Sequence, residues 1–186
     1  LVLKISEQAE ISENVIIEGA VYIEKGAKVF EGAVLKGPLY IGKDVIIGNY
    51  SLIRGGAVLE EGVRVGAYSE VKNSILGKGS GFDSGTVLDS IIGEDVKIGA
   101  NVLTANVRLD RKGVKFDTGD GKVDTGLHSF GVVIGDKAKL GVRVTTMPGI
   151  TIGMNAFIGP STPVMHSVET NKKYFLKFEP QIEENS

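Results

Sequence analysis

The sequence of 186 residues contains no cysteine, no tryptophan and only two histidines, His128 and His166. Without cysteine the chain has neither disulfides nor thiolate metal sites, and two histidines are too few for a histidine-rich metal site. No apolar run approaches the length that crosses a membrane, and no signal peptide is visible. The net charge of −2 gives no sign of a nucleic-acid-binding surface. These absences favour a soluble cytoplasmic protein with no metal site and no nucleic-acid or membrane partner.

What the sequence has is a strict six-residue period of aliphatic residues. Every sixth position in the first part of the chain carries one: Ile5, Ile11, Ile17, Ile23, Val29, Leu35, Ile41, Ile47, Ile53, Leu59, Val65 and Val71. This period fits neither an amphipathic helix, whose period is near 3.6, nor a flat strand, whose period is two. It is typical of a parallel β-helix built from hexapeptide repeats, in which each turn stacks on the previous one.

The rest of each hexad supports an all-β solenoid. A small or aliphatic residue follows four positions after most anchors, as in Ala27, Ala33 and Val45, so two residues per hexad fill a narrow interior. Glycine or a polar residue often follows the anchor, where the chain turns a corner. Three hexads form one coil with three flat faces. Right-handed crossovers are the general rule, but hexapeptide-repeat proteins are left-handed, and this resemblance predicts a left-handed parallel β-helix.

The period predicts one repeat domain over residues 1–169, followed by a short C-terminal tail over residues 170–186. The phase slips between Asn73 and Asp89, hexads resume at Ile92, and the pattern disappears over a long loop insertion at residues 107–130. A loop this long in a compact repeat is usually functional or forms its own small hairpin. Hexads return at Ile134, and the YFLKF segment of the tail is read as an edge strand or a docking segment.

Several runs resemble one family, the C-terminal β-helix domain of bifunctional sugar-1-phosphate nucleotidylyltransferase/acetyltransferases of the glucosamine-1-phosphate acetyltransferase type. The runs are LIRGGA at 52–57, VGAYSEVKN at 65–73, LGKGS at 76–80 and IGANVLTAN at 98–106. The archaeal branch extends the similarity through NVRLDRKGVK at 106–115, and the resemblance resumes over residues 131–164. The hexads are generic, whereas the EVKN run and the run from Asn106 to Lys115 are more specific.

The resemblance implies an acetyltransferase that uses acetyl-CoA and a sugar-1-phosphate, preferably an amino sugar, with the site shared between the subunits of a homotrimer. It also implies an upstream nucleotidyltransferase domain, which we expect to be absent from this chain. Arg54 would face the phosphate, because guanidinium binds phosphate in a bidentate manner. Lys72 would hold the sugar phosphate as a point charge, and Asn106 would orient the acceptor sugar or the acetyl group.

Loop residues complete the implied set. By resemblance, Lys112 and Lys115 would lie at the edge of the site, near the sugar phosphate or the phosphates of CoA. His128 stands where relatives tend to carry basic residues, so contact with a CoA phosphate is one interpretation and a surface histidine is the other. His166 is read as structural. The alternative interpretation of Arg54, Lys72, Lys112 and Lys115 is that each is a solvated surface charge.

The sequence departs from the family at the general base. The family carries His-x-x-Tyr about six residues before an Asp-Ser pair, which here is Asp89-Ser90. Counting back places Asp83 at the histidine position and Thr86 at the tyrosine position. Histidine suits proton removal from an amine because its pKa lies near neutral pH, whereas aspartate has a reference pKa near 4. Asp83 is the candidate base, and burial would have to raise its pKa.

Two further functions compete with the enzyme. The missing histidine and tyrosine favour a non-catalytic β-helix that trimerises and regulates a glucose-1-phosphate-type nucleotidylyltransferase. The retained run from Asn106 to Lys115 argues against that role. A β-helix carbonic anhydrase shares the fold, but it needs several histidine ligands for zinc, and the two histidines here cannot supply them.

Overall fold

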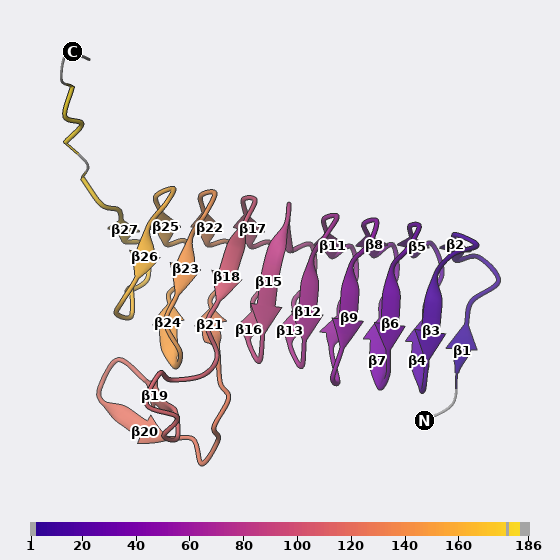
Figure 1. The fold of residues 1–186 in the computed structure, drawn as a ribbon, viewed down its shortest axis with the longest axis horizontal. Helices are drawn as coiled ribbons and strands as arrows, with labels where there is room; N and C mark the ends of the chain where they lie inside the picture. The colour runs from indigo at the N-terminus through magenta and orange to yellow at the C-terminus, as the bar shows by residue number, and fades with distance from the viewer. Residues whose placement is uncertain (1–2, 178, 183–186) are drawn as a thin grey trace.

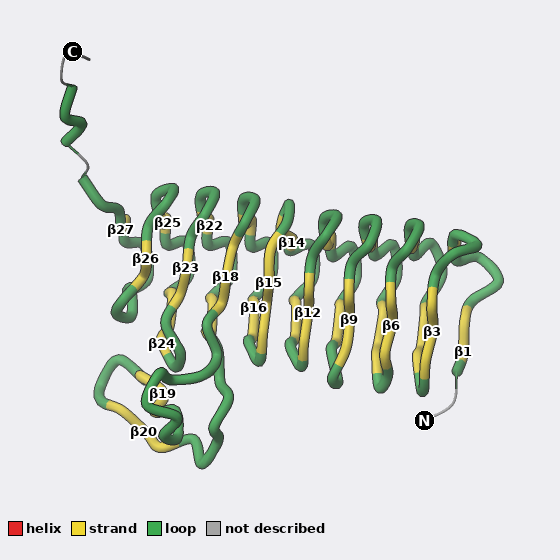
Figure 2. Tube along the Cα trace, viewed as in Figure 1, coloured by secondary structure: helices red, strands yellow, loops and turns green. Residues whose placement is uncertain are grey.

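A computed structural model describes residues 3–177 and 179–182 and shows a three-faced solenoid of short parallel strands (Figure 1). Through most of the chain, successive strands lie on successive faces, so a strand usually pairs with the strand three positions later, one coil above. Figure 2 shows a row of stacked coils in which the strands alternate with turns, and the described residues contain no helix. This architecture confirms the predicted all-β parallel β-helix.

The three faces are called sheets A, B and C. Sheet A contains β1 (Lys4–Ile5), β4 (Val21–Ile23), β7 (Leu39–Ile41), β10 (Val58–Leu59), β13 (Ile75–Leu76), β16 (Ile91–Ile92), β21 (Val132–Ile134) and β24 (Ile150–Ile152). Sheet B contains β2 (Glu10–Ile11), β5 (Lys28–Val29), β8 (Ile46–Ile47), β11 (Arg64–Val65), β14 (Gly81–Phe82), β17 (Lys97–Ile98), β22 (Lys139–Leu140), β25 (Phe157–Ile158) and β27 (Lys173–Tyr174). Sheet C contains β3 (Ile16–Glu18), β6 (Val34–Lys36), β9 (Leu52–Arg54), β12 (Glu70–Lys72), β15 (Gly85–Leu88), β18 (Val102–Thr104), β23 (Thr145–Thr146) and β26 (Pro163–Val164).

The predicted hexad anchors fill the interior of the solenoid. All nine from Ile23 to Val71 are at most 1% exposed. The anchors of the first coil are less covered, and Ile5 is 37% exposed. A terminal coil has a neighbour on one side only, so its inward residues remain partly open to solvent. Burial of this continuous column of aliphatic side chains is the main force that holds coil on coil.

The slip in phase corresponds to shorter coils and not to a break in the solenoid. Val58 pairs with Ile75 and Ile75 pairs with Ile91, so both of these coils are slightly shorter than three full hexads. The corners after β12 and β15 are turned by Asn73 and Asp89, whose φ angles of 45° and 47° lie in the left-handed region. Asparagine and aspartate enter this region more readily than most residues, so each corner is made in a shorter stretch of chain.

The long insertion leaves the stacking unchanged. Ile91 on β16 pairs directly with Val133 on β21. The chain between them exceeds a regular coil by the length of four hexads, which is also the length of the segment 107–130. Within it, β19 (Lys115–Asp117) and β20 (Lys122–Asp124) form an antiparallel hairpin that stands to one side of the coils (Figures 1 and 2). The small hairpin anticipated for this loop is therefore present.

The end of the described chain adds one more strand to sheet B. β27 pairs in parallel with β25, so the predicted edge strand includes Tyr174, the first residue of the YFLKF segment, while Phe175 to Lys177 lie outside the strand. None of the described residues forms a helix long and apolar enough to span a membrane.

Candidate active site

A buried carboxylate lies at the corner where the chain passes from sheet C to sheet A. Asp89 follows β15 directly and is only 8% exposed. Its backbone N–H donates to the carbonyl of Lys72, at 2.8 Å, in the coil below. Its carbonyl accepts from the backbone N–H of Gly131, also at 2.8 Å, in the coil above. The residue is thus fixed by both neighbouring coils before its side chain makes any contact.

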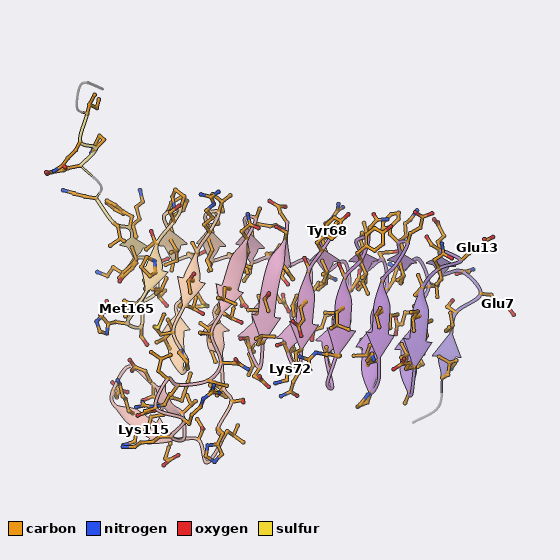
Figure 3. The ribbon with its side chains drawn as sticks, viewed as in Figure 1. Glu7, Glu13, Tyr68, Lys72, Lys115 and Met165 are labelled. Atoms are coloured by element: carbon orange, nitrogen blue, oxygen red, sulfur yellow. The ribbon has the colours of Figure 1, made fainter. Side chains whose placement is uncertain are left out.

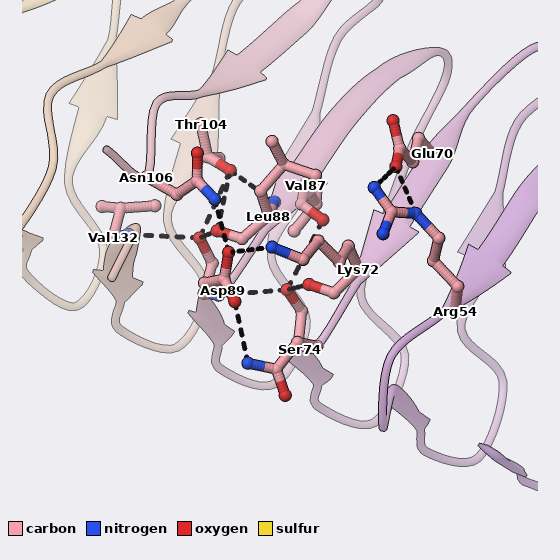
Figure 4. A network of polar contacts seen from close by, with 12 residues as sticks. Arg54, Glu70, Lys72, Ser74, Val87, Leu88, Asp89, Thr104, Asn106 and Val132 are labelled. Atoms are coloured by element: carbon pink, nitrogen blue, oxygen red, sulfur yellow. Dashed lines mark hydrogen bonds and ion pairs between the residues drawn. The ribbon is translucent and has the colours of Figure 1, made fainter. Parts of the chain in front are cut away.

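Three side chains donate hydrogen bonds to this carboxylate (Figure 4). The Lys72 ammonium and the Asn106 amide both donate to Oδ2, the former at 3.1 Å, and the Asn73 amide donates to Oδ1 at 2.8 Å. Burial of Asp89 favours its protonated form, but the donors outweigh burial and hold the pKa of the carboxyl below its ordinary value. Asp89 is therefore an anion at neutral pH.

Hydroxyl groups replace aliphatic side chains in the interior behind this corner. Ser74, Ser90 and Thr104 are each at most 2% exposed. Ser90 Oγ donates to the carbonyl of Leu88 at 2.7 Å and accepts from the backbone N–H of Val132 at 3.1 Å. Satisfied buried polar groups of this kind fix local geometry, so the corner that carries Asp89 is rigid.

Arg54 lies one coil below Lys72 on sheet C and is also paired with a carboxylate. Its guanidinium donates twice to Glu70, from Nε at 2.8 Å and from Nη2 at 2.7 Å (Figure 4). The backbone register places Thr86 beside Glu70. Thus Arg54, Lys72, Thr86 and Asn106 gather along one side of sheet C and its corner. Both cations carry an intramolecular partner.

Asp83 is not part of this group. It is exposed and stands at the corner between sheets B and C, whereas Asn106 stands at the corner between sheets C and A. Strand β15 separates the Asp83 corner from Asp89. Asp83 instead lines a cleft of about 370 Å³ on sheet B together with Arg64, Lys97 and other residues. Within one chain, the two residues predicted to be catalytic therefore face different surfaces.

The loop lysines lie in a second cleft, between the hairpin and the last coils. This cleft has a volume of about 370 Å³, and its charged lining is mostly cationic, with Arg108, Lys112, Lys115 and Lys122 beside Asp117; His166 also lines it. Figure 3 shows Lys115 on the hairpin and Met165, another lining residue, on the neighbouring coil. We refer to it as the hairpin cleft. The two predicted loop lysines are thus brought together, and His166, which was read as structural, is exposed in the same cleft.

His128 occupies an exposed position near the Asp89 corner. Its neighbours Leu127 and Ser129 line a smaller cleft of about 280 Å³ that also includes Asn73 and Asp89. The end of the insertion therefore forms one wall of the space next to the buried carboxylate.

Several residues with a place in these sites were absent from the sequence-based set, among them Glu70, Asn73, Asp89, Arg108, Lys122 and His166. Spacing was the available signal for Asp89, because Lys72, Asp89 and Asn106 follow one another at equal intervals of about one coil. Residues one coil apart occupy the same column of a solenoid. Glu70 likewise lies about one coil after Leu52 and about one coil before Thr86, with which it shares a column.

Comparison with known proteins supplies the family. Residues 17–119 match the family described as GMPPB C-terminal domain, and residues 131–159 match the hexapeptide repeat of succinyl-transferase. The bifunctional protein GlmU of Methanococcus aeolicus is 40% identical over 178 residues, which cover 95% of this chain and 43% of that protein. GlmU of Methanocaldococcus jannaschii is 42% identical over 165 residues, which cover 88% of this chain and 40% of that protein.

The chain thus spans about two fifths of the length of these relatives. Among solved structures, UDP-N-acetylglucosamine acyltransferase of Francisella novicida has a TM-score of 0.49 at 17% identity, covering 88% of this chain and 61% of that chain. The similarity to archaeal bifunctional GlmU proteins confirms the relationship predicted from the sequence runs. The chain belongs to the GMPPB C-terminal domain family of hexapeptide-repeat β-helices.

Proposed function

We propose that this chain is an acetyltransferase domain that transfers an acetyl group from acetyl-CoA to a sugar-1-phosphate, preferably an amino sugar. Two arguments support this. The relatives that it matches are named bifunctional GlmU proteins and, in Sulfurisphaera tokodaii, a bifunctional sugar-1-phosphate nucleotidylyltransferase/acetyltransferase. The observation that carries the proposal is the pairing of a rigid polar corner at Asp89 with a cationic cleft on the same row of corners, between sheets C and A.

The reaction sets the requirements for the site. The amine nitrogen of the sugar attacks the thioester carbonyl, a tetrahedral intermediate forms, and the CoA thiolate leaves as the carbonyl is restored. The nitrogen must lose a proton to a base, and the leaving thiolate accepts a proton. The protein therefore has to bind phosphate, orient the amine and accept one proton.

The hairpin cleft is the better of the two phosphate-binding candidates. Arg54 and Lys72 are each neutralised by a carboxylate, Glu70 and Asp89. By contrast, none of Lys112, Lys115 and Lys122 has a direct ion pair with any residue of the part of the chain that the structure describes. Cations without a protein counterion attract a phosphate dianion most strongly. In this proposal Arg54 and Lys72 order the acceptor side of the site through their ion pairs.

The outer surface of sheet A supports a homotrimer. One register column across this sheet is apolar for six coils: Tyr22, Tyr40, Val58, Ile75, Ile91 and Val133. Ile75 and Ile91 are 42% and 43% exposed in the single chain. The equivalent column of sheet B carries several charges, among them Lys28, Arg64, Lys97 and Lys139. A contiguous apolar face of this kind marks a contact surface, and three copies of one chain would bury it in a closed ring.

A contact through sheet A has a consequence for the base. In a three-faced solenoid the corner between sheets B and C, where Asp83 stands, is opposite sheet A. Asp83 of one subunit therefore reaches Asn106 of the next only if sheet C also takes part in the contact, from its corner with sheet B to its corner with sheet A. We propose Asp83 as the base, and the Asp83→Ala variant tests it. Loss of turnover supports the assignment, while unchanged kinetics removes Asp83 from the mechanism.

The test of the function is release of the CoA thiol from acetyl-CoA with a panel of amino and non-amino sugar-1-phosphates. We expect release with glucosamine- or galactosamine-1-phosphate. The double variant Lys112→Gln/Lys115→Gln should raise KM for the sugar phosphate by about 100-fold or more, because each substitution removes a charged phosphate contact of roughly 1.5–3 kcal/mol. Lys25→Gln, at an exposed lysine of a distant coil, is the matched control. Absence of release with any acceptor from a folded trimer would contradict the proposal.

A second candidate is a non-catalytic module that trimerises and regulates a nucleotidylyltransferase. The position of Asp83 favours it, because this exposed carboxylate is separated by β15 from the polar corner. In that case the panel gives no thiol release, while variants of sheet A abolish assembly.

A further inference from the structure

We propose that Asp89 is a positioning residue, which presents the amide oxygen of Asn106 to the acceptor and holds the Lys72 ammonium beside it. The inference rests on the proposed acetyl transfer. It gives a role to Asp89, which the family motif contains only as part of the Asp-Ser pair, and it is carried by the contacts of the carboxylate.

The first step is the orientation of the Asn106 amide. An ionised carboxylate only accepts hydrogen bonds, so the group of Asn106 that faces it must be the NH2 and not the carbonyl. The Nδ2 atom of Asn106 donates to Oδ2 of Asp89. A flipped amide would place two oxygens against each other. The charge of Asp89 therefore selects one of the two amide orientations.

The second step is the rigidity of both partners. Asp89 is held by backbone hydrogen bonds to Lys72 and Gly131, each of 2.8 Å. The backbone carbonyl of Asn106 accepts from the N–H of Phe130 at 2.8 Å, which ties it to the end of the insertion. These contacts fix the backbone of both residues, and the three side-chain donors hold the carboxylate of Asp89 in place. The orientation of the amide is thus set before any ligand binds, which is the arrangement that favours catalysis.

The third step is what remains available to a ligand. With Nδ2 directed at Asp89, Asn106 offers its Oδ1 as a hydrogen-bond acceptor. An amine or hydroxyl group of an acceptor sugar can donate to that oxygen. The Lys72 ammonium, already donating to Asp89, has two further N–H groups for oxygens of the same sugar. Asp89 thereby favours an acceptor that carries an N–H or O–H donor next to oxygens.

The test begins with Asp89→Asn, a substitution of nearly equal shape that removes the charge. Asparagine tolerates the left-handed backbone of this corner, as Asn73 in the coil below shows with φ 45°. The matched control is Asp95→Asn, which makes the same change at an exposed left-handed corner with φ 55°. We expect kcat to fall about 10- to 100-fold in Asp89→Asn, which is the effect of losing one hydrogen bond to a charged group. In Asp95→Asn we expect kcat to stay unchanged.

A double-mutant cycle with Asn106→Ala separates positioning from a structural effect. If Asp89 acts largely through Asn106, the loss of kcat in the double variant should be clearly smaller than the product of the two single losses, with the remainder due to Lys72. If the loss of kcat in the double variant equals the product of the losses in the two single variants, the proposal is overturned. An Asp89→Asn enzyme with unchanged kcat would overturn it as well. If the wild-type protein itself turns over no acceptor, the proposed function has failed, and the next measurement decides on Asp89 independently.

That measurement is the side-chain amide signal of Asn106 in protein labelled with ¹⁵N-asparagine. In the wild-type protein the signal should be shifted from the free-amide position and its protons should exchange slowly, because one of them is bonded to a carboxylate. Asp89→Asn should move the signal and speed the exchange, and Asp95→Asn should not. A signal that is the same in all three proteins would contradict the assignment.

Discussion

At the scale of single residues, the charge of Asp89 is stabilised by the fold, which makes folding depend on pH. Its pKa is lowered in the folded protein, because the hydrogen bonds from Asn73, Asn106 and Lys72 outweigh its burial. A carboxyl group with a depressed folded pKa adds stability that is fully present above its unfolded pKa, near 3.9. That stability is lost as the pH falls through the lower, folded pKa.

We therefore predict a pH-dependent difference between the wild-type protein and Asp89→Asn. Near neutral pH the wild type should be more stable, because it keeps a carboxylate with three donors, one of them an ammonium. The difference in the free energy of unfolding should shrink as the pH falls below about 4, because Asp89 of the unfolded chain is protonated there, and it should vanish once the folded carboxyl is protonated as well. Urea denaturation from pH 3 to pH 7 measures it, and a difference independent of pH would show that the charge contributes nothing.

A second prediction at this scale concerns Gly85, which opens β15 with a φ of 126°. A Cβ atom there would lie 2.2 Å from the backbone carbonyl oxygen of Val102 in the next coil. Gly85→Ala should destabilise the protein by about 2–3 kcal/mol, because the strained backbone cannot relax without separating the coils. Gly121→Ala, at a hairpin glycine with no atom within 4 Å of its Cβ position, is the control and should change stability by less than about 0.5 kcal/mol.

At the scale of elements, the hairpin is attached to the solenoid by a small number of specific contacts. Asp117 donates its backbone N–H to Gly149 at 2.9 Å, and its carboxylate accepts from Ser167 Oγ at 2.9 Å. Hydrogen bonds from the backbone N–H of Gly119 and from Ser167 hold the pKa of Asp117 below its ordinary value. Val114, at the base of the hairpin, is only 1% exposed. The walls of the hairpin cleft therefore depend on this attachment.

Val114→Ala should loosen the hairpin without unfolding the solenoid. Removing two buried methyl groups costs roughly 2 kcal/mol, and this loss falls on the local opening of the hairpin. We expect faster cleavage by a broad-specificity protease within residues 118–121, and a higher KM for the sugar phosphate. Val123→Ala removes the same atoms from a residue of β20 that is 58% exposed, and should leave both unchanged. Equal cleavage of the two variants would show that Val114 does not hold the hairpin.

At the scale of the whole molecule, the sequence predicts the solenoid well and the site only in part. The anchors from Ile23 to Val71 identify the interior because a narrow core must repeat with the coil. The shortened coils hide the period after Val71, since corners made by Asn73 and Asp89 carry no aliphatic signal. Motif resemblance selected Lys72 and Asn106, which lie together, but it marked Asp89 only as part of the Asp-Ser pair and gave the carboxylate between them no role.

Other properties follow from spatial arrangement that no motif contains. That Arg54 and Lys72 are neutralised while the hairpin lysines are not depends on which carboxylates the coils bring beside them. The remoteness of Asp83 from Asn106 depends on which corner each one occupies. A search of the sequence for opposite charges one coil apart would have found the two ion pairs, because Glu70 and Asp89 each follow their cationic partner by about one coil.

The assembly prediction also belongs to this scale. Ile75→Asp places a charge in the middle of the apolar column of sheet A and should dissociate the oligomer at concentrations where the wild type is associated. Phe157→Asp makes a similar change on sheet B, at a residue that is 45% exposed, and should leave the mass unchanged. Light scattering measures the mass of each. A trimer that survives Ile75→Asp but not Phe157→Asp would show that sheet B is the contact face.

The long step between Ile91 and Val133 shows how a repeat protein gains new chemistry. Making one coil more than twice as long adds under about 1 kcal/mol of closure entropy, because that cost grows only with the logarithm of length. Every pair above the insertion keeps its register, so the core does not have to be redesigned. Each corner of such a solenoid is therefore a place where evolution or a protein engineer can add a binding loop and leave the rest of the molecule as it was.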